Sequence, residues 1–140
     1  MKNIAVLGST GSIGTSTLDV ISLNLDKFSI SLLASDSNYK LLIKQCKKFN
    51  PKYVYLRDSN AARLFKDKLG SINLRTSIVN ESDFLEIISI PEVDTVVAGI
   101  VGIAGLRSVY KAVEAGKRVL LANKESYVVA GELLNQLARK

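Results

Sequence analysis

The residues best suited to chemistry stand near the start of the chain, where glycines recur at every third position. Gly8, Gly11 and Gly14 follow the apolar run of residues 4–7 and lead into a segment with helical periodicity that begins at Ser12. A strand, a glycine turn and a helix N-terminus form an anion site, because free backbone N–H groups and the positive end of the helix dipole point to one place. The spacing therefore predicts a phosphate-binding loop.

Each glycine of this loop has its own predicted role. We expect Gly8 to make the tight turn, Gly11 to let a pyrophosphate approach the backbone, and Gly14 to let helix and strand pack closely. Thr10 and Ser12 add hydroxyl groups at the same place. The alternative, a strand–helix turn that binds nothing, is disfavoured by the strand and helix that flank the glycines.

A second polar segment follows the apolar run of residues 28–34. Asp36 stands 22 positions after Gly14, where a dinucleotide-binding fold places the acidic residue that contacts the adenosine ribose. Asp36 could equally cap the helix that follows, and at this point both interpretations stay open. Ser37 and Asn38 complete the polar segment.

Two further segments carry chemical signals. Three glycines and an alanine recur within residues 99–106, where the backbone could lie against a flat ring or against another backbone. Asn123, Lys124 and Glu125 directly follow the last apolar run. Asn123 fits the cap of a helix and Glu125 fits its first turn, but the charge of Lys124 opposes the helix dipole there. We therefore expect Lys124 to meet an anion or a substrate.

These segments must be positioned by strands that alternate with helices. Helical patterns separate nearly all of the apolar runs, which predicts a parallel sheet with helices on both faces and a doubly wound topology. In such sheets the ligand lies beyond the carboxyl ends of the strands, and all four of these segments fall there. The fold class is therefore α/β and Rossmann-like, with a mainly parallel six-stranded sheet. The predicted strands are residues 4–7, 28–34, 53–56, 75–79, 94–98 and 118–122.

Composition narrows the class of protein further. The chain has 140 residues, of which 47% are hydrophobic and 23% charged, as in a globular domain. No apolar run reaches the ~20 residues of a membrane helix, so we expect no membrane partner. Cys46 is the only cysteine and lies on an apolar helix face, which is consistent with a core residue and a cytoplasmic protein.

The net charge and the absence of histidine indicate which classes of ligand the chain can bind. No histidine is present, which disfavours a zinc site and leaves acid–base work to Lys, Asp, Glu or Tyr. The net charge of +6 suits a phosphate-rich ligand. Lysines in the helix at residues 39–49 lack interleaved aromatic residues, so we interpret them as a solvated face and expect no nucleic-acid partner.

Three stretches together are similar to the 1-deoxy-D-xylulose 5-phosphate reductoisomerase family. They are LGSTGSIG at residues 7–14 with STLD at 16–19, the loop at 99–106, and LLANKES at 120–126. The resemblance extends over the whole chain. It implies an enzyme that converts 1-deoxy-D-xylulose 5-phosphate to 2-C-methyl-D-erythritol 4-phosphate in non-mevalonate isoprenoid biosynthesis, using NADPH and a divalent metal, Mg²⁺ or Mn²⁺.

The resemblance also implies roles for the matched residues. Residues of the glycine loop would hold the pyrophosphate and neighbouring groups of NADPH: Thr10, Gly11, Ser12 and Ile13. Asn38 would lie at the adenosine end of the cofactor. Asn123 and Glu125 would contact its nicotinamide side, and Lys124 would reach the phosphorylated sugar substrate.

This chain corresponds to about the first third of the family pattern. The family's metal-binding acidic residues, catalytic flap and C-terminal helical domain come after the point that matches Lys140. We therefore expect residues 1–140 to be a dinucleotide-binding domain without metal ligands or catalytic residues, which binds the cofactor weakly and is inactive alone. The full-length family protein is expected to be a homodimer.

Asp36 and Ser37 depart from the family, which commonly has Gly and then often Lys at these positions. A carboxylate beside a 2′-phosphate is repulsive and favours NADH, whereas the family uses NADPH. We follow the family, because Ser37 and Asn38 can still donate hydrogen bonds.

Other functions remain as alternatives. The glycine loop would also suit another two-domain dehydrogenase, such as aspartate-semialdehyde or homoserine dehydrogenase, although the motif at 123–126 favours the reductoisomerases. A non-catalytic dinucleotide sensor or a basic nucleic-acid-binding module would share the loop or the charge, respectively.

Overall fold

Strands and helices alternate along the computed structural model, which describes residues 1–100, 105–121 and 139. The strands are β1 (Lys2–Leu7), β2 (Phe28–Ser35), β3 (Tyr53–Leu56), β4 (Ser77–Ile78), β5 (Thr95–Ala98) and β6 (Arg118–Leu121). The helices of the described residues are α1 (Ser12–Ser22), α2 (Tyr39–Phe49), α3 (Ser59–Leu69), α4 (Glu81–Ser89) and α5 (Leu106–Glu114). None of these helices is long and apolar enough to cross a membrane.

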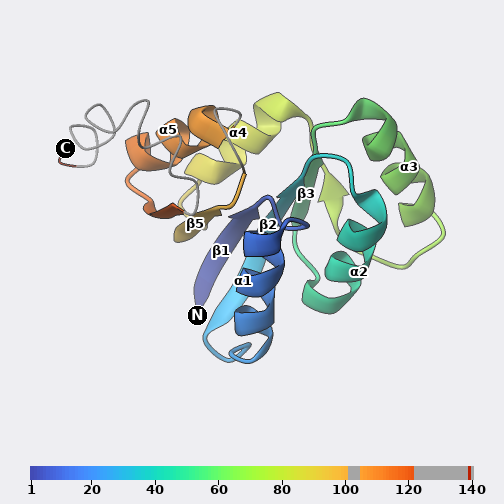
Figure 1. The fold of residues 1–140 in the computed structure, drawn as a ribbon, viewed down its shortest axis with the longest axis horizontal. Helices are drawn as coiled ribbons and strands as arrows, with labels where there is room; N and C mark the ends of the chain where they lie inside the picture. Colours follow the sequence, from blue (N-terminus) through green and yellow to red (C-terminus); the bar gives the residue numbers. More distant parts are fainter. Residues whose placement is uncertain (101–104, 122–138, 140) are drawn as a thin grey trace.

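The strands form one sheet in the order β4-β3-β2-β1-β5-β6, and every pair is parallel. This confirms the predicted α/β class with a six-stranded parallel sheet. From β1 the chain first builds outward through β2, β3 and β4, then returns to place β5 and β6 on the other side of β1 (Figure 1). The reversal lies between β1 and β5, and ligands of such sheets bind at the carboxyl ends of the strands at this point.

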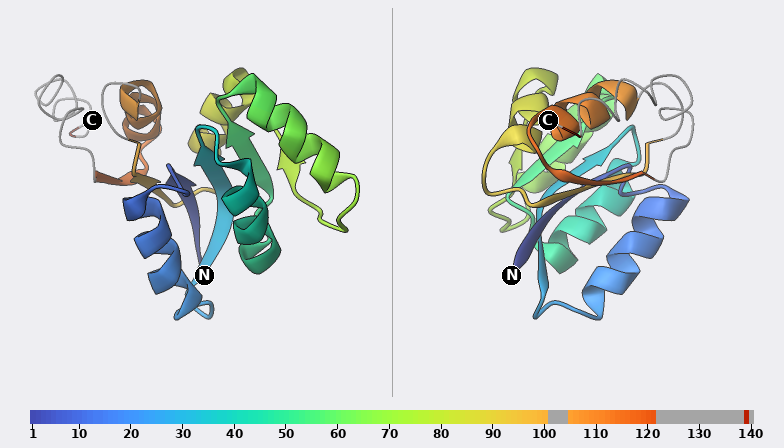
Figure 2. Two further views of the ribbon diagram at one scale, coloured as in Figure 1. Left: turned by 45° about the vertical axis from the view of Figure 1, so that its right-hand side comes forward. Right: turned by 90° about the vertical axis from the view of Figure 1, so that its left-hand side faces the viewer.

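Helices cover both faces of the sheet because side chains alternate along each strand. Ile4 and Val6 belong to a core that includes residues of α1, α2 and α3, whereas Ala5 and Leu7 belong to a core that includes residues of α4 and α5. Figure 2 shows α1 and α2 on one side of the strands and α4 and α5 on the other. β1 is therefore buried on both faces, as its unbroken apolar sequence predicts.

Cys46 packs in the first of these cores, as its place on the apolar face of α2 predicts. Its side chain is fully buried, and burial raises the pKa of the thiol to about 12. A thiol with such a pKa is almost entirely protonated at neutral pH, so Cys46 is a packing residue without nucleophilic reactivity.

Two elements are shorter by two or more residues than the sequence pattern predicts: the strand expected at residues 75–79 and the first helix, expected from Ser12 to about Asn24. β4 is confined to Ser77–Ile78, since the buried hydroxyl of Thr76 donates to the carbonyl of Pro51 (2.7 Å) and only two residues pair with β3. Helix α1 ends at Ser22, where the side-chain amide of Asn24 donates to the carbonyl of Val20 (2.9 Å) and closes the last turn. Neither change moves the carboxyl edge of the sheet.

The assigned core can be tested by comparing the same substitution at a buried and at an exposed leucine. Leu33 is fully buried in β2, whereas Leu23 is 84% exposed after α1. Leu33→Ala should lower the free energy of unfolding by about 2–5 kcal/mol, because it removes buried methyl groups and leaves a cavity. The same change at Leu23 should stay within about 0.5 kcal/mol. Urea unfolding measures both, and equal losses would contradict the assigned core.

Candidate functional site

The glycine loop joins β1 to α1 at the carboxyl edge of the sheet. Gly8 has φ +77°, a conformation that favours glycine, so the tight turn predicted for it is confirmed. The N–H groups of Gly8 and Ser9 both donate to the carbonyl of Ala34 at the end of β2 (2.8 and 2.9 Å), and the Gly11 N–H donates back to the Gly8 carbonyl (3.1 Å). These bonds fix the loop against the neighbouring strand.

Three backbone segments meet too closely at this point for side chains. A Cβ atom on Gly14 would lie 2.1 Å from the Gly8 carbonyl oxygen, and a Cβ atom on Gly8 would lie 2.7 Å from the Gly99 carbonyl oxygen. A Cβ atom on Gly99 would in turn lie 2.9 Å from the carbonyl oxygen of Leu7. The close packing predicted for Gly14 is thus confirmed, and Gly99 lies against another backbone.

Gly11 differs from these glycines because the fold does not require it. A Cβ atom there would meet only the Gly8 carbonyl oxygen, at 3.4 Å. Gly11 is the N-cap of α1 and offers no side-chain cap. In the part of the chain that the structure describes, the N–H groups of Ser12 and Ile13 have no acceptor, as is usual for the first turn of a helix. This exposed helix end can therefore donate to an anion.

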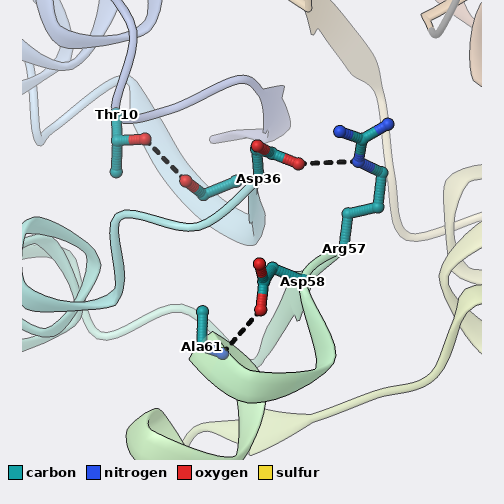
Figure 3. A network of polar contacts seen from close by, with 6 residues as sticks. Thr10, Asp36, Arg57, Asp58 and Ala61 are labelled. Atoms are coloured by element: carbon teal, nitrogen blue, oxygen red, sulfur yellow. Dashed lines mark hydrogen bonds and ion pairs between the residues drawn. The ribbon is translucent and has the colours of Figure 1, made fainter.

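In the polar segment after β2, one residue caps the next helix and another forms an ion pair. Asn38 caps α2, since its Oδ1 accepts from the N–H of Leu41 (3.2 Å). The cap alternative for Asp36 is therefore wrong. Asp36 Oδ1 instead accepts a hydrogen bond from Nε of Arg57 (2.6 Å), just after β3 (Figure 3). Among residues 1–100, 105–121 and 139 the Nδ2 group of Asn38 has no acceptor, so it can donate to a ligand.

Two hydrogen bonds attach the glycine loop to its surroundings. The hydroxyls of Thr10 and Ser35 lie 2.5 Å apart and join the loop to the end of β2. Gln45, buried in α2, donates from Nε2 to the carbonyl of Ser9 (2.8 Å). We did not predict a role for Gln45, and the available signal was a polar residue between Leu42 and Cys46 on the apolar face of the helix.

Arg57 is the second residue that the sequence analysis missed. The sequence feature that could have indicated it is its position directly after a predicted strand, because the other site segments also directly follow strands. The hydrogen bond to Asp36 and the negative charge of that carboxylate raise the pKa of the Arg57 guanidinium further, so it stays protonated. The side chains are 67% and 60% exposed, and ion pairs at such exposure stabilise a fold very little.

A cavity of about 410 Å³ opens above this edge. That volume falls within the range of about 300–1,000 Å³ that is typical of small-molecule sites. The predicted site residues that line it are Gly8, Thr10, Gly11 and Asp36. The other predicted residues of the described chain flank it without lining it: Ser12, Ile13, Gly14, Ser37 and Asn38. Asn123, Lys124 and Glu125 lie outside the described residues.

The opposite wall of the cavity comes from β3, α4 and α5. Tyr55 stacks on Phe84 with ring centroids 4.4 Å apart, which supplies an apolar, aromatic surface. Burial, aided by the charge of Glu81, raises the pKa of the Tyr55 hydroxyl, so it stays neutral. Arg107 pairs with Glu81 at 3.5 Å. The cavity thus combines an aromatic wall with two arginines, each partly neutralised by a carboxylate.

Metal-ligating side chains do not gather in residues 1–100, 105–121 or 139. In these ranges no group of three or more His, Cys, Asp or Glu side chains is arranged to hold a metal ion. The described donors are hydroxyls, amides, guanidinium groups and free backbone N–H groups, which suit an anionic organic ligand.

Comparison with known proteins gives a consistent family. The family model described as 1-deoxy-D-xylulose 5-phosphate reductoisomerase matches residues 4–131. The reductoisomerase of Saccharophagus degradans is 49% identical over 140 residues, covering 99% of this chain and 36% of that protein. The Haemophilus ducreyi reductoisomerase is 45% identical, covering 100% of this chain and 36% of that protein. The chain thus spans about a third of the length of these curated relatives.

Solved structures agree. A DOX-P reductoisomerase crystallised with NADPH, fosmidomycin and magnesium superposes with a TM-score of 0.93 at 39% identity, over 99% of this chain and 34% of that one. The Zymomonas mobilis reductoisomerase in complex with NADPH gives a TM-score of 0.89 at 36% identity, over 99% of this chain and 36% of that one. On the family match, the sequence identity and the shared fold, this chain belongs to the 1-deoxy-D-xylulose 5-phosphate reductoisomerase family.

Proposed function

We propose that residues 1–140 are the NADPH-binding domain of an oxidoreductase that rearranges and reduces 1-deoxy-D-xylulose 5-phosphate to 2-C-methyl-D-erythritol 4-phosphate. The observation that carries this proposal is the uncapped N-terminus of α1, which opens beside a cavity at the reversal point of the sheet. Its donors fit the pyrophosphate of a dinucleotide. Family membership supports the choice of NADPH, because relatives have been crystallised with it.

In this proposal the glycine loop binds the pyrophosphate. The free N–H groups of Ser12 and Ile13 and the hydroxyl of Thr10 donate to its oxygens, and Gly11 leaves room for it because no side chain projects there. Gly8 and Gly14 contribute by holding the turn in shape. Bound NADPH would supply the hydride for the reduction.

The two ends of the cofactor fall to other segments of the chain. Asp36, Ser37 and the free Nδ2 of Asn38 lie after β2, at the end of the cavity where adenosine binds in this fold. We assign Asn123 and Glu125 to the nicotinamide side, and Lys124 to the phosphorylated sugar, from their match to the family motif at 120–126. An ammonium group suits the anionic substrate.

The remaining parts of the activity are proposed for a longer protein. Mg²⁺ or Mn²⁺, turnover of the sugar phosphate and a homodimer are assigned to the full-length enzyme, and residues 1–140 alone are proposed to be inactive. The basis is that this chain covers 36% of its curated relatives. We further propose a cytoplasmic protein with no membrane or nucleic-acid partner.

NADPH should protect the chain against heat. A ligand that binds only the folded state at about 100 times its Kd stabilises it by about 2.7 kcal/mol, which raises Tm by several degrees. Thermal unfolding with and without NADPH measures this shift. A single-stranded oligonucleotide serves as the control, and protection by the oligonucleotide alone, falling steeply with salt, would favour the nucleic-acid module instead.

Alanine substitutions at Gly11 and Gly14 should have different effects on NADPH binding and on stability. Gly11→Ala should cost at most about 1 kcal/mol of stability, because the added methyl fits the fold. It should weaken NADPH binding tenfold or more by occupying the place of the pyrophosphate. Gly14→Ala should cost about 3 kcal/mol or more, since its methyl overlaps a backbone carbonyl.

Calorimetric titration and urea unfolding of both variants provide the two measurements. Normal NADPH binding by folded Gly11→Ala would contradict the proposed position of the pyrophosphate.

A further inference from the structure

The ion pair between Asp36 and Arg57 leaves most of the arginine unused. Asp36 takes only the Nε hydrogen of Arg57. Figure 3 shows the contact with Asp36 at Nε and the two terminal nitrogens at the outer end of the guanidinium, with no contact drawn to either. Within the described residues, neither terminal nitrogen has an acceptor. Arg57 therefore presents a two-pronged donor whose orientation is set by Asp36.

We propose that Arg57 binds the 2′-phosphate of NADPH and that Asp36 is the residue that positions it. This inference rests on the proposed function and adds a specificity determinant to it. A guanidinium donates two parallel hydrogen bonds to a phosphate and remains charged at any physiological pH. In dinucleotide-binding folds that use NADPH, a nearby arginine accommodates this phosphate.

The ion pair also explains how NADPH can bind next to the carboxylate of Asp36. A lone carboxylate after the second strand accepts hydrogen bonds from the ribose hydroxyls of NADH and repels a 2′-phosphate. Here a positive charge lies 2.6 Å from that carboxylate, and both residues line the cavity. The negative charge of Asp36 is therefore countered by the positive charge of Arg57 at the adenosine end.

Arg107 is the other described cation that lines the cavity, but it stands at the wrong end. It lies in α5, which follows β5, whereas Arg57 follows β3, the neighbour of β2. Strands β2 and β3 lie on one side of β1 and β5 on the other. Adenosine binds over the β2 side in this fold, which places its ribose phosphate next to Arg57.

The main test removes the guanidinium and compares two cofactors that differ only by the phosphate. Arg57→Gln should weaken NADPH binding by about 10- to 100-fold, the range for losing a charge-assisted hydrogen bond. Binding of NADH should change by less than about twofold, because NADH lacks the group that Arg57 contacts. The matched control is Arg63→Gln, which breaks an exposed pair with Asp67 on α3, away from the cavity.

A second pair of variants tests the positioning role of Asp36. If Asp36 only repelled the phosphate, Asp36→Ala would tighten NADPH binding. If it orients Arg57, Asp36→Ala should weaken NADPH binding by about 3- to 10-fold, and Asp36→Asn, which keeps an acceptor for Nε, should restore it. Titrations with adenosine 2′,5′-bisphosphate and adenosine 5′-monophosphate isolate the same phosphate on a smaller probe.

The outcomes separate this inference from the proposed function. Equal losses for NADPH and NADH in Arg57→Gln, or no loss for either, would overturn the role of Arg57 while leaving a dinucleotide site intact. Tighter NADPH binding by Asp36→Ala would overturn the positioning role. If the unaltered chain bound neither dinucleotide, the proposed function would fail and the inference with it.

Discussion

The site depends on how closely three backbone segments approach each other at Gly8, Gly14 and Gly99. Each lies where a side chain would overlap a carbonyl oxygen of a neighbouring segment. This contact sets the end of β1, the start of α1 and the exit of β5 in one fixed arrangement. It fixes the first turn of α1 beside the cavity that Gly11 lines, and in the described part of the chain the N–H groups of Ser12 and Ile13 in that turn have no acceptor. The close packing of these backbone segments thus determines where the loop presents its free N–H donors.

Much of the fold could be predicted from the sequence, because strand and helix periodicity is strong here. The bounds of α2 and β3 agree with the predicted ones, as does the parallel arrangement of the strands. β4 was overestimated because its length is decided by how many residues pair with β3, which is a tertiary property. The extra residue Ser31, which shifts the register of β2 against β1, likewise leaves no local signal.

The candidate site was predictable only where one segment carries the signal. The glycine loop contains its own geometry, so Gly8 and Gly14 could be assigned from spacing alone. Gln45 and Arg57 act through partners 36 and 21 positions away, Ser9 and Asp36, and such pairings exist only once the chain is folded. Considered alone, Asp36 indicated the opposite cofactor preference from the one that its partner now supports.

The link between Asp36 and Arg57 has an evolutionary consequence. Asp36 and Arg57 directly follow two neighbouring strands and neutralise each other, so losing either charge alone leaves the other uncompensated beside the cavity. The two positions are therefore expected to covary among relatives. A lineage could pass from a lysine or glycine after the second strand to an acid there, provided that an arginine arises across the strand boundary.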